Sequence, residues 1–216
     1  MAPNSKDHFY SEVQLREIAE DIEKSVTVPV NVMVEADHRV YDLREVERIL
    51  RAANKIVLQD CGCRKEYRNC DAPLDVCLGL DEDAEYALKS GGGRVVSLGE
   101  ALKVLERSHE AGLVHMAYVM KGKEKPGLIC SCCPCCCHTL GGLLRYGIHA
   151  QVLSSSFLAS DDEEKCVQCG KCVQRCVFGA RSMNDGLVYE ESKCMGCGLC
   201  VTTCPTNAIS MKPRIN

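Results

Sequence analysis

Two cysteine runs with the same spacing lie close to the C-terminus and constrain the chain more than any other feature. Each run has the form C-x2-C-x2-C-x3-C, and the second follows the first by 28 residues. Three cysteines two residues apart can wrap a loop around three corners of a cubane cluster, and a remote fourth thiolate can close it. The runs are Cys166, Cys169, Cys172 and Cys176, then Cys194, Cys197, Cys200 and Cys204. The spacing predicts a duplicated set of iron–sulfur ligands.

Zinc is the main alternative for these eight thiols, because paired C-x2-C motifs also bind that ion. The uninterrupted run of four cysteines, present twice, favours iron–sulfur clusters. Gly170, Gly196 and Gly198 suit the tight turns of a cluster-binding loop, although ordinary turns use glycine for the same reason.

The segment from about Glu163 to Lys212 resembles the bacterial two-[4Fe–4S] ferredoxin family. In that family the fourth cysteine of each run binds the other cluster. The resemblance implies one [4Fe–4S] cluster on Cys166, Cys169, Cys172 and Cys204. It implies a second [4Fe–4S] cluster on Cys194, Cys197, Cys200 and Cys176. Pro205 follows Cys204 as the family pattern requires, whereas Val177 follows Cys176 and departs from it, which puts local packing in question rather than the ligand.

Ten further cysteines lie upstream in two groups. The first group is Cys61, Cys63, Cys70 and Cys77, which are enough thiolates for one cubane. Their neighbours are strongly polar, which argues against buried structural thiols. Arg64, Lys65 and Arg68 either offset the charge of a thiolate-ligated cluster or form a solvated basic face.

The second upstream group places six thiols within eight residues, more than one cubane can use. It consists of Cys130, Cys132, Cys133, Cys135, Cys136 and Cys137. Both groups together are predicted to form a cluster region with one or two further iron–sulfur clusters of undetermined type. Three arrangements are open: the two groups share their thiols between two cubanes, or they hold an enlarged cluster, or some of the thiols are redox-active neighbours of a cluster. His138 is either a ligand or, as is commoner, a hydrogen-bonding neighbour.

The whole chain also resembles ferredoxin-like proteins of anaerobic bacteria and archaea that carry an upstream C-x-C-R segment and a C-C-x-C-C-C segment. That resemblance implies iron–sulfur binding and a protein redox partner, which could be part of a larger oxidoreductase complex. It implies no substrate.

Cysteine makes up 18 of the 216 residues, a density that would suggest disulfides in a secreted protein. Residues 1–10 lack the apolar core of a secretory signal, so metal binding in the cytoplasm is the stronger interpretation. The net charge of −4 is unlike the basic footprint of a nucleic-acid binder. No apolar run reaches the roughly 18 residues of a membrane span.

The expected fold class is α+β, with a cysteine-rich domain over 1–157 and a ferredoxin-like domain over 158–216. Helices are expected over 12–24, 43–53, 98–110 and 140–146, and capping boxes at Asp42/Glu45 and Ser97/Glu100 open the second and third of them. Strands are expected over 55–58, over 113–120 and 128–129, which together look like a hairpin, and over 187–189 after the turn Asp185-Gly186. Val26–Val34 is expected to be an edge strand or irregular because of Pro29. The acidic segment 154–165 is expected to be a solvated linker, and Gly91–Gly93 a flexible loop.

Three functional hypotheses follow from these motifs. The leading one is an electron-transfer protein or subunit that relays electrons through several clusters, as a component of an oxidoreductase rather than a stand-alone enzyme. The second is a catalytic iron–sulfur subunit with an unusual cluster at 130–137. The third is a redox sensor or a scaffold for cluster assembly.

Overall fold

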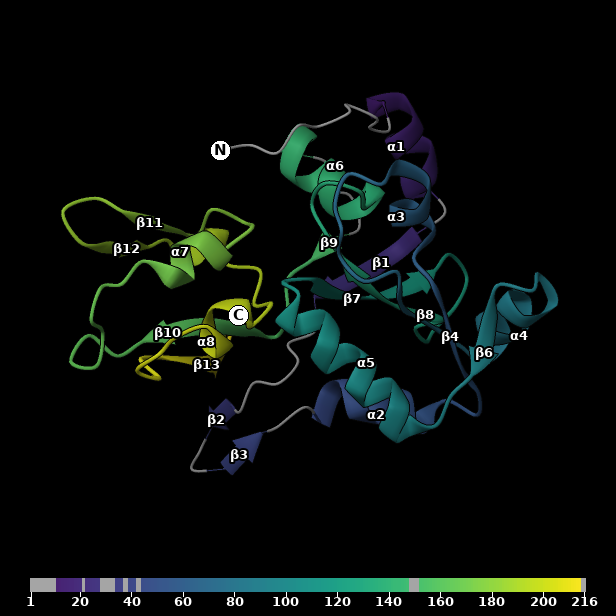
Figure 1. Cartoon of the computed structure of the whole chain (residues 1–216), viewed down its shortest axis with the longest axis horizontal. Helices are drawn as coiled ribbons and strands as arrows, with labels where there is room; N and C mark the ends of the chain where they lie inside the picture. The colour runs from purple at the N-terminus through teal and green to yellow at the C-terminus, as the bar shows by residue number, and fades with distance from the viewer. Residues whose placement is uncertain are drawn as a thin grey trace. The chain divides into compact units, whose positions relative to one another are not determined.

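The structure is a computed structural model that describes residues 11–20, 22–27, 34–36, 39–41, 44–147 and 152–214. Helices and strands are both present, so the predicted α+β class is confirmed (Figure 1). The chain divides into two compact units, each described here by itself. The first comprises Met1–Val26 with Ile49–Leu153, and the second comprises Thr27–Arg48 with Ser154–Asn216. The domain boundary between 157 and 158 stays a prediction.

The first unit is built on a mainly antiparallel sheet in the order β6-β4-β5-β8-β7-β1-β9. Its strands are β1 (Ile22–Thr27), β4 (Ile56–Asp60), β5 (Asp75–Leu80), β6 (Gly93–Val95), β7 (Val114–Met120), β8 (Leu128–Cys132) and β9 (Val152–Leu153). Strand β1 pairs in parallel with β9, and β7 and β8 form the predicted hairpin. The central strands are apolar and almost fully buried, and they supply the core of this unit.

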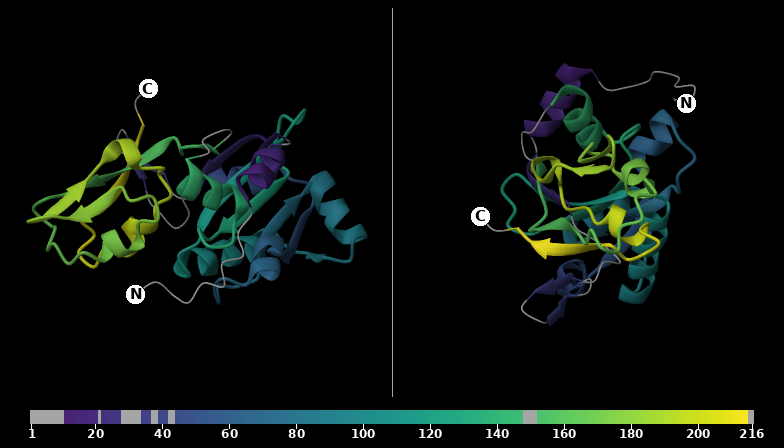
Figure 2. Two further views of the ribbon diagram at one scale, coloured as in Figure 1. Left: turned by 90° about the horizontal axis from the view of Figure 1, so that it is seen from above. Right: turned by 90° about the vertical axis from the view of Figure 1, so that its left-hand side faces the viewer.

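The helices of the first unit are α1 (Glu12–Glu20), α3 (Gly62–Tyr67), α4 (Asp81–Lys89), α5 (Leu98–Glu110) and α6 (His138–Tyr146), with α2 (Arg44–Ala52) spanning the division between the units. Helices α4 and α5 pack against the sheet, whereas α1 packs against α6 (Figures 1 and 2). Helix α5 begins as its capping box predicts, because Ser97 Oγ accepts a hydrogen bond from the Glu100 amide. Within the described residues, none of the helices is long and apolar enough to cross a bilayer.

Two local predictions were wrong in part, and a third falls mostly outside the described residues. The helix expected over 12–24 ends at Glu20, and the chain continues as strand β1 from Ile22. The region of Gly91–Gly93 is a turn that leads into β6, where Gly93 pairs with Gln59. The stretch 28–33, which holds most of the expected edge strand, and the capping residue Asp42 lie outside the described residues.

The second unit repeats one pattern of strand, cysteine loop, short helix and strand. The first copy contains β10 (Phe157–Asp161), α7 (Lys171–Arg175) and β11 (Arg181–Met183). The second contains β12 (Leu187–Tyr189), the 3-10 turn η1 (Glu191–Lys193), α8 (Leu199–Thr202) and β13 (Ile209–Pro213). The first strand of each copy pairs with the last strand of the other copy, so that β10 pairs with β13 and β12 pairs with β11. Strands β2 (Val34–Ala36) and β3 (Arg39–Tyr41) extend the β10-β13 sheet.

The acidic segment before the first run is not a plain linker. Residues 157–161 form β10, and both carboxylate oxygens of Asp161 accept hydrogen bonds from Arg181 at 2.6 and 2.8 Å. The expectation was wrong for 157–161, because charge alone was taken as a sign of exposure, whereas a paired carboxylate can be largely buried; Glu163, Glu164 and Lys165 are exposed, as expected.

Candidate metal centres

The eight cysteines of the two C-terminal runs line two separate cavities. One cavity is bordered by Pro205 and Ile209, and its cysteines are Cys166, Cys169, Cys172 and Cys204. The other is bordered by Ala159 and Met211, and its cysteines are Cys176, Cys194, Cys197 and Cys200. Each cavity thus takes three cysteines from one run and the fourth from the other. The surrounding side chains are largely apolar, an environment that limits the access of water to a bound cluster.

Local backbone geometry shapes both cavities. Gly170 and Gly198 have left-handed φ angles of 71° and 74° directly before helices α7 and α8, which glycine adopts without strain. Gly196 also has a positive φ of 73°, and a Cβ there would lie 2.0 Å from the carbonyl oxygen of Phe157. The Ala208 amide donates to Cys204 Sγ at 3.2 Å, the kind of contact that stabilises a thiolate ligand.

Arg181 is a buried cation beside both cavities. Its side chain is 1% exposed and is held by Asp161. It also lies within hydrogen-bonding reach of Cys172, in the first cavity, and Cys200, in the second. Burial opposes its charge, yet Asp161 and the two nearby cysteines raise the pKa of Arg181. A permanent positive charge is therefore placed between the two sets of thiols.

The ten upstream cysteines of the first unit come together at one end of its sheet. Cys77 on β5 and Cys130 on β8 lie across from each other in the antiparallel register that pairs Leu78 with Ile129. Cys132 is on the same face as Cys130, two residues further along β8. Cys61 and Cys63 begin helix α3.

Six of these thiols form a closed ring, which we call the six-thiol ring. Each thiol shifts the pKa of the next, in the order Cys61, Cys63, Cys137, Cys132, Cys130, Cys77 and back to Cys61. The ring joins thiols from α3, β5, β8 and the start of α6.

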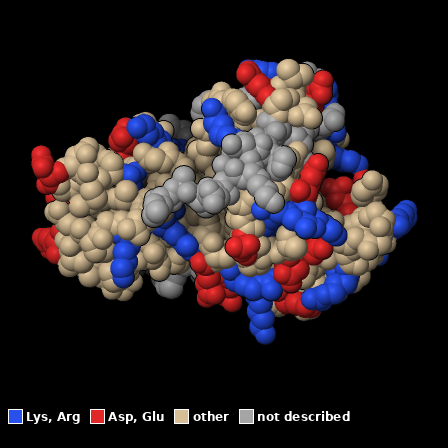
Figure 3. All heavy atoms as spheres, turned by 45° about the horizontal axis from the view of Figure 1, so that its top comes forward, with Lys and Arg blue, Asp and Glu red and all other residues tan. Residues whose placement is uncertain are grey.

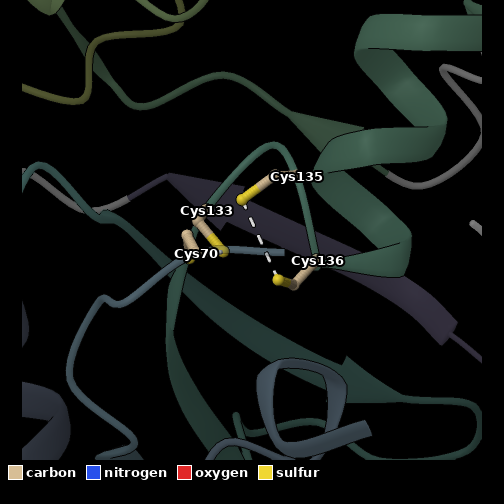
Figure 4. Close-up of side chains that lie close together, drawn as sticks. All are labelled: Cys70, Cys133, Cys135 and Cys136. Carbon is tan, nitrogen blue, oxygen red and sulfur yellow. Dashed lines mark hydrogen bonds between the residues drawn. The ribbon is translucent and has the colours of Figure 1, made fainter. Parts of the chain in front are cut away.

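The remaining four upstream thiols form a second set, which we call the four-thiol group. It consists of Cys70, Cys133, Cys135 and Cys136. Their four sulfur atoms all lie within 4.8 Å of one another, and Figure 4 shows them converging from two loops. Two of the separations are 3.6 Å, between Cys70 and Cys133, and 3.8 Å, between Cys135 and Cys136. Cys70 therefore lies with the cysteines of the loop before α6 and not with Cys61, Cys63 and Cys77, its neighbours in the sequence.

So many thiols at such close range cannot all ionise without a cation. Hydrogen bonds from Cys63 and Cys77 lower the pKa of Cys61 to about 2, whereas contacts with Cys137 and Cys61 raise the pKa of Cys63. Burial and the charge of Cys133 raise the pKa of Cys136 to about 12. Bound metal would relieve this repulsion, because coordination keeps thiolates deprotonated.

Polar side chains around these thiols add to what the spacing predicted. His138 Nδ1 lies 3.2 Å from Cys63 Sγ, the distance of a hydrogen bond. The hydroxyl of Tyr118 lies 3.9 Å from the sulfurs of both Cys132 and Cys137. Sequence reasoning missed Tyr118, because a tyrosine within an apolar strand has no spacing signal.

Of the three basic residues near the first group, one is buried. The side chain of Arg64 donates to the carbonyl oxygens of Pro73 and, at 2.9 Å, Ser131, and it contacts Cys133. Lys65 and Arg68 are exposed. For all three residues we expected either charge compensation or a solvated basic face. The buried position of Arg64 beside Cys133 suits charge compensation, and the exposure of Lys65 and Arg68 suits a solvated face.

Comparison with known families supports iron–sulfur binding in the second unit. Residues 187–210 match the family described as 4Fe-4S binding domain. This stretch contains the second cysteine run, and the chain therefore carries a ferredoxin-like iron–sulfur domain. A comparison with curated proteins found no match.

Proposed function

We propose that the protein is an electron-transfer protein or subunit that relays electrons through several iron–sulfur clusters. In this proposal, two [4Fe–4S] clusters in residues 158–216 form the C-terminal part of the relay. The observation that carries the proposal is the division of eight cysteines between two cavities, three from one run and one from the other. The 4Fe-4S family match over the second run supports it independently.

The two proposed clusters would be close neighbours. Cys172 lines the first cavity and Cys176 lines the second, and four residues of chain span at most about 14 Å. The separation of the two metal centres is thus limited by the chain itself. A short separation favours electron exchange between clusters, which is the property that a relay needs.

The six-thiol ring is the proposed site of a further cluster. Among the described residues, no three of its thiols lie mutually within 4.8 Å, so the ring is more open than the ligand set of one ion. Cluster ligands need this wider spacing, because each thiolate binds a different iron atom. The ring also offers more than the four thiolates of a cubane, which leaves an enlarged cluster as a second possibility.

A protein redox partner is proposed as the donor or acceptor, with the protein acting in the cytoplasm. Acidic and basic side chains are interspersed over the face shown in Figure 3, and the net charge is −4. Such a surface is compatible with docking to another protein, and it gives no reason to propose a nucleic acid.

The function is tested by anaerobic purification, followed by counts of iron and acid-labile sulfide and a redox titration monitored by EPR. About eight iron and eight sulfide per chain are expected from the second unit, and a larger number if the ring is loaded. Reversible one-electron signals should appear during the titration. Iron and sulfide near zero would contradict the proposal.

A catalytic role is the second candidate, and the excess of thiols in the ring is the observation that favours it. A cluster with spare coordination could bind a substrate directly. A substrate-dependent change in the upstream EPR signal, lost in Cys132→Ala while the C-terminal signals persist, would support catalysis. Signals unaffected by disulfides and other reducible substrates would leave electron transfer as the function.

A further inference from the structure

We propose that the four-thiol group binds a single divalent metal ion in tetrahedral thiolate coordination, separate from the clusters. The site lies in the first unit, between the loop after α3 and the loop before α6. This inference is independent of the electron-transfer proposal, because it concerns thiols that neither the C-terminal clusters nor the six-thiol ring uses.

The spacing of the sulfur atoms carries the argument. Zinc–sulfur bonds of about 2.3 Å in a tetrahedron place the four sulfurs about 3.8 Å apart. The thiolates of a cubane lie roughly 6 Å apart, because each binds a different corner iron. All four sulfurs here lie within 4.8 Å of one another, with separations of 3.6 and 3.8 Å. The group is therefore too compact for a cubane and has the size of a one-ion site.

The second unit provides an internal comparison. Its eight cysteines have the spacing of cubane ligands and surround cavities, and the four of the second run lie within the 4Fe-4S family match. In the part of the chain that the structure describes, those eight cysteines form no set of three or more within 4.8 Å. The same chain thus contains two kinds of cysteine site that differ in sulfur spacing.

Groups around the four thiols suit a bound dication. Four thiolates and one divalent ion have a net charge of −2, and the buried guanidinium of Arg64 at Cys133 offsets part of it. Asn69 holds the loop by donating its side-chain amide to the Cys135 carbonyl at 2.9 Å, and its backbone N–H donates to the Cys136 thiolate. These contacts fix the ligand loops and stabilise the charged form of the ligands.

The proposed ion would serve to hold the fold. Three ligands come from one short turn, and Cys70 comes from a loop 63 residues earlier in the chain. Four protein thiolates leave no open position, as in structural rather than catalytic zinc sites. The ion would fix the turn that also presents Cys132 and Cys137 to the six-thiol ring.

The test uses the anaerobically purified full chain and Zn²⁺ as the probe. Wild-type protein is incubated with a small excess of Zn²⁺, desalted, and analysed for zinc, iron and sulfide, and zinc-edge X-ray absorption gives the coordination. Cys70→Ala is the test variant, because Cys70 is a partly exposed loop residue. Cys63→Ala, in the six-thiol ring, is the matched control.

The expected result is one tightly held zinc per wild-type chain, with four sulfur neighbours at about 2.3 Å and no neighbouring metal. Cys70→Ala should lose this ion with no loss of sulfide, and Cys63→Ala should retain it. Loss of iron and sulfide together in Cys70→Ala would overturn the proposal, as would a wild-type chain that retains no zinc. If Cys70→Ala does not fold, the zinc-edge spectrum of the wild-type chain still tests the proposal, because four sulfur neighbours around an isolated zinc would support it and any other coordination would contradict it. The C-terminal EPR signals stay unchanged in either case, so they report on the electron-transfer proposal separately.

Discussion

The two units place their cysteines in contrasting surroundings. In the first unit the sheet strands and helix α5 form an extended apolar core, and the thiols gather at one end of it. In the second unit a cluster of packed buried residues has only four members, Ala159, Cys172, Ile209 and Met211, and one of them is a cysteine of the first run. Because a short chain with few buried apolar groups gains little from burial, we expect the second unit to depend on bound metal for its stability.

The thiols themselves also differ between the units. Those of the second unit stand around cavities, whereas those of the first unit contact one another directly. Cysteine count alone therefore does not define a cofactor. In the proposed assignment, sulfur spacing distinguishes an ion site from a cluster site, and the size of the apolar core sets how far each unit is expected to rely on bound metal.

Removal of a C-terminal ligand should have the largest effect. Cys204→Ala is expected to lose about four iron and four sulfide and to destabilise the second unit severely, because one cluster loses its closing ligand. Metal analysis and EPR of the anaerobic protein measure the loss.

Double variants test the crossed assignment itself. Cys166→Ala combined with Cys204→Ala should lose no more iron than either single variant, because both residues serve one cluster. Cys194→Ala combined with Cys204→Ala should lose both clusters. The reverse pattern would show that each run binds its own cluster.

Arg181→Met should have the next largest effect. It leaves the carboxylate of Asp161 buried without its partner, which costs about 3–5 kcal/mol in free energy of unfolding. It also removes a positive charge near both cavities, so both cluster potentials should become more negative. Anaerobic denaturant unfolding and redox titration measure the two effects.

Lys193→Met is the matched control for Arg181→Met, because its ion pair with Glu190 is exposed and should contribute under about 1 kcal/mol. Adding Asp161→Leu to Arg181→Met also removes the unpaired negative charge beside the first cavity, so much of the stability should be recovered and the potentials should return toward the wild-type values. Unchanged potentials in Arg181→Met would show that the guanidinium has only a structural role.

The sequence predicted the second unit better than the first. Each cysteine of the repeat was found by spacing, and strand β12 followed from the turn residues Asp185 and Gly186. Arg181 was missed, although the repeat held a signal for it. Ala180 corresponds to Ala208 at the 28-residue offset, and Arg181 then stands where the second copy has Ile209. A charge in an apolar position of a repeat points to a buried partner.

The first unit was predicted in its local elements but not in its thiol sites. Helix α5, strand β4 and the β7-β8 hairpin follow from capping and apolar patterns that act over a few residues. The division of ten thiols into sets of six and four depends on sheet register, which brings β5 beside β8 across about 50 residues of chain. Neighbouring cysteines such as Cys132 and Cys133 therefore belong to different sets, which sequence spacing cannot show.

Gly93→Ala tests whether the first unit stands on its apolar core. A Cβ at Gly93 would lie 2.5 Å from Val57 Cγ1 and 2.8 Å from the Leu58 carbonyl oxygen, so overpacking should cost about 1–3 kcal/mol. Metal content should not change. Gly99→Ala is the control, since a Cβ there meets open space within helix α5 and should stabilise it by up to about 1 kcal/mol. Equal stability of the two variants would contradict a tightly packed β4-β6 pair.

Tyr118→Phe should have the smallest effect and should act on the first unit alone. The change removes a hydroxyl 3.9 Å from the sulfurs of Cys132 and Cys137 and keeps the buried ring, so the cost in stability is about 1 kcal/mol. Loss of a hydrogen bond to ligand sulfur lowers the potential of a cluster. The upstream EPR signal should therefore titrate at a more negative potential, while both C-terminal signals and the metal content stay as in wild type. A shift in the C-terminal potentials instead would mean that the two units are coupled, and an unshifted upstream signal would mean that the six-thiol ring does not ligate the cluster responsible for it.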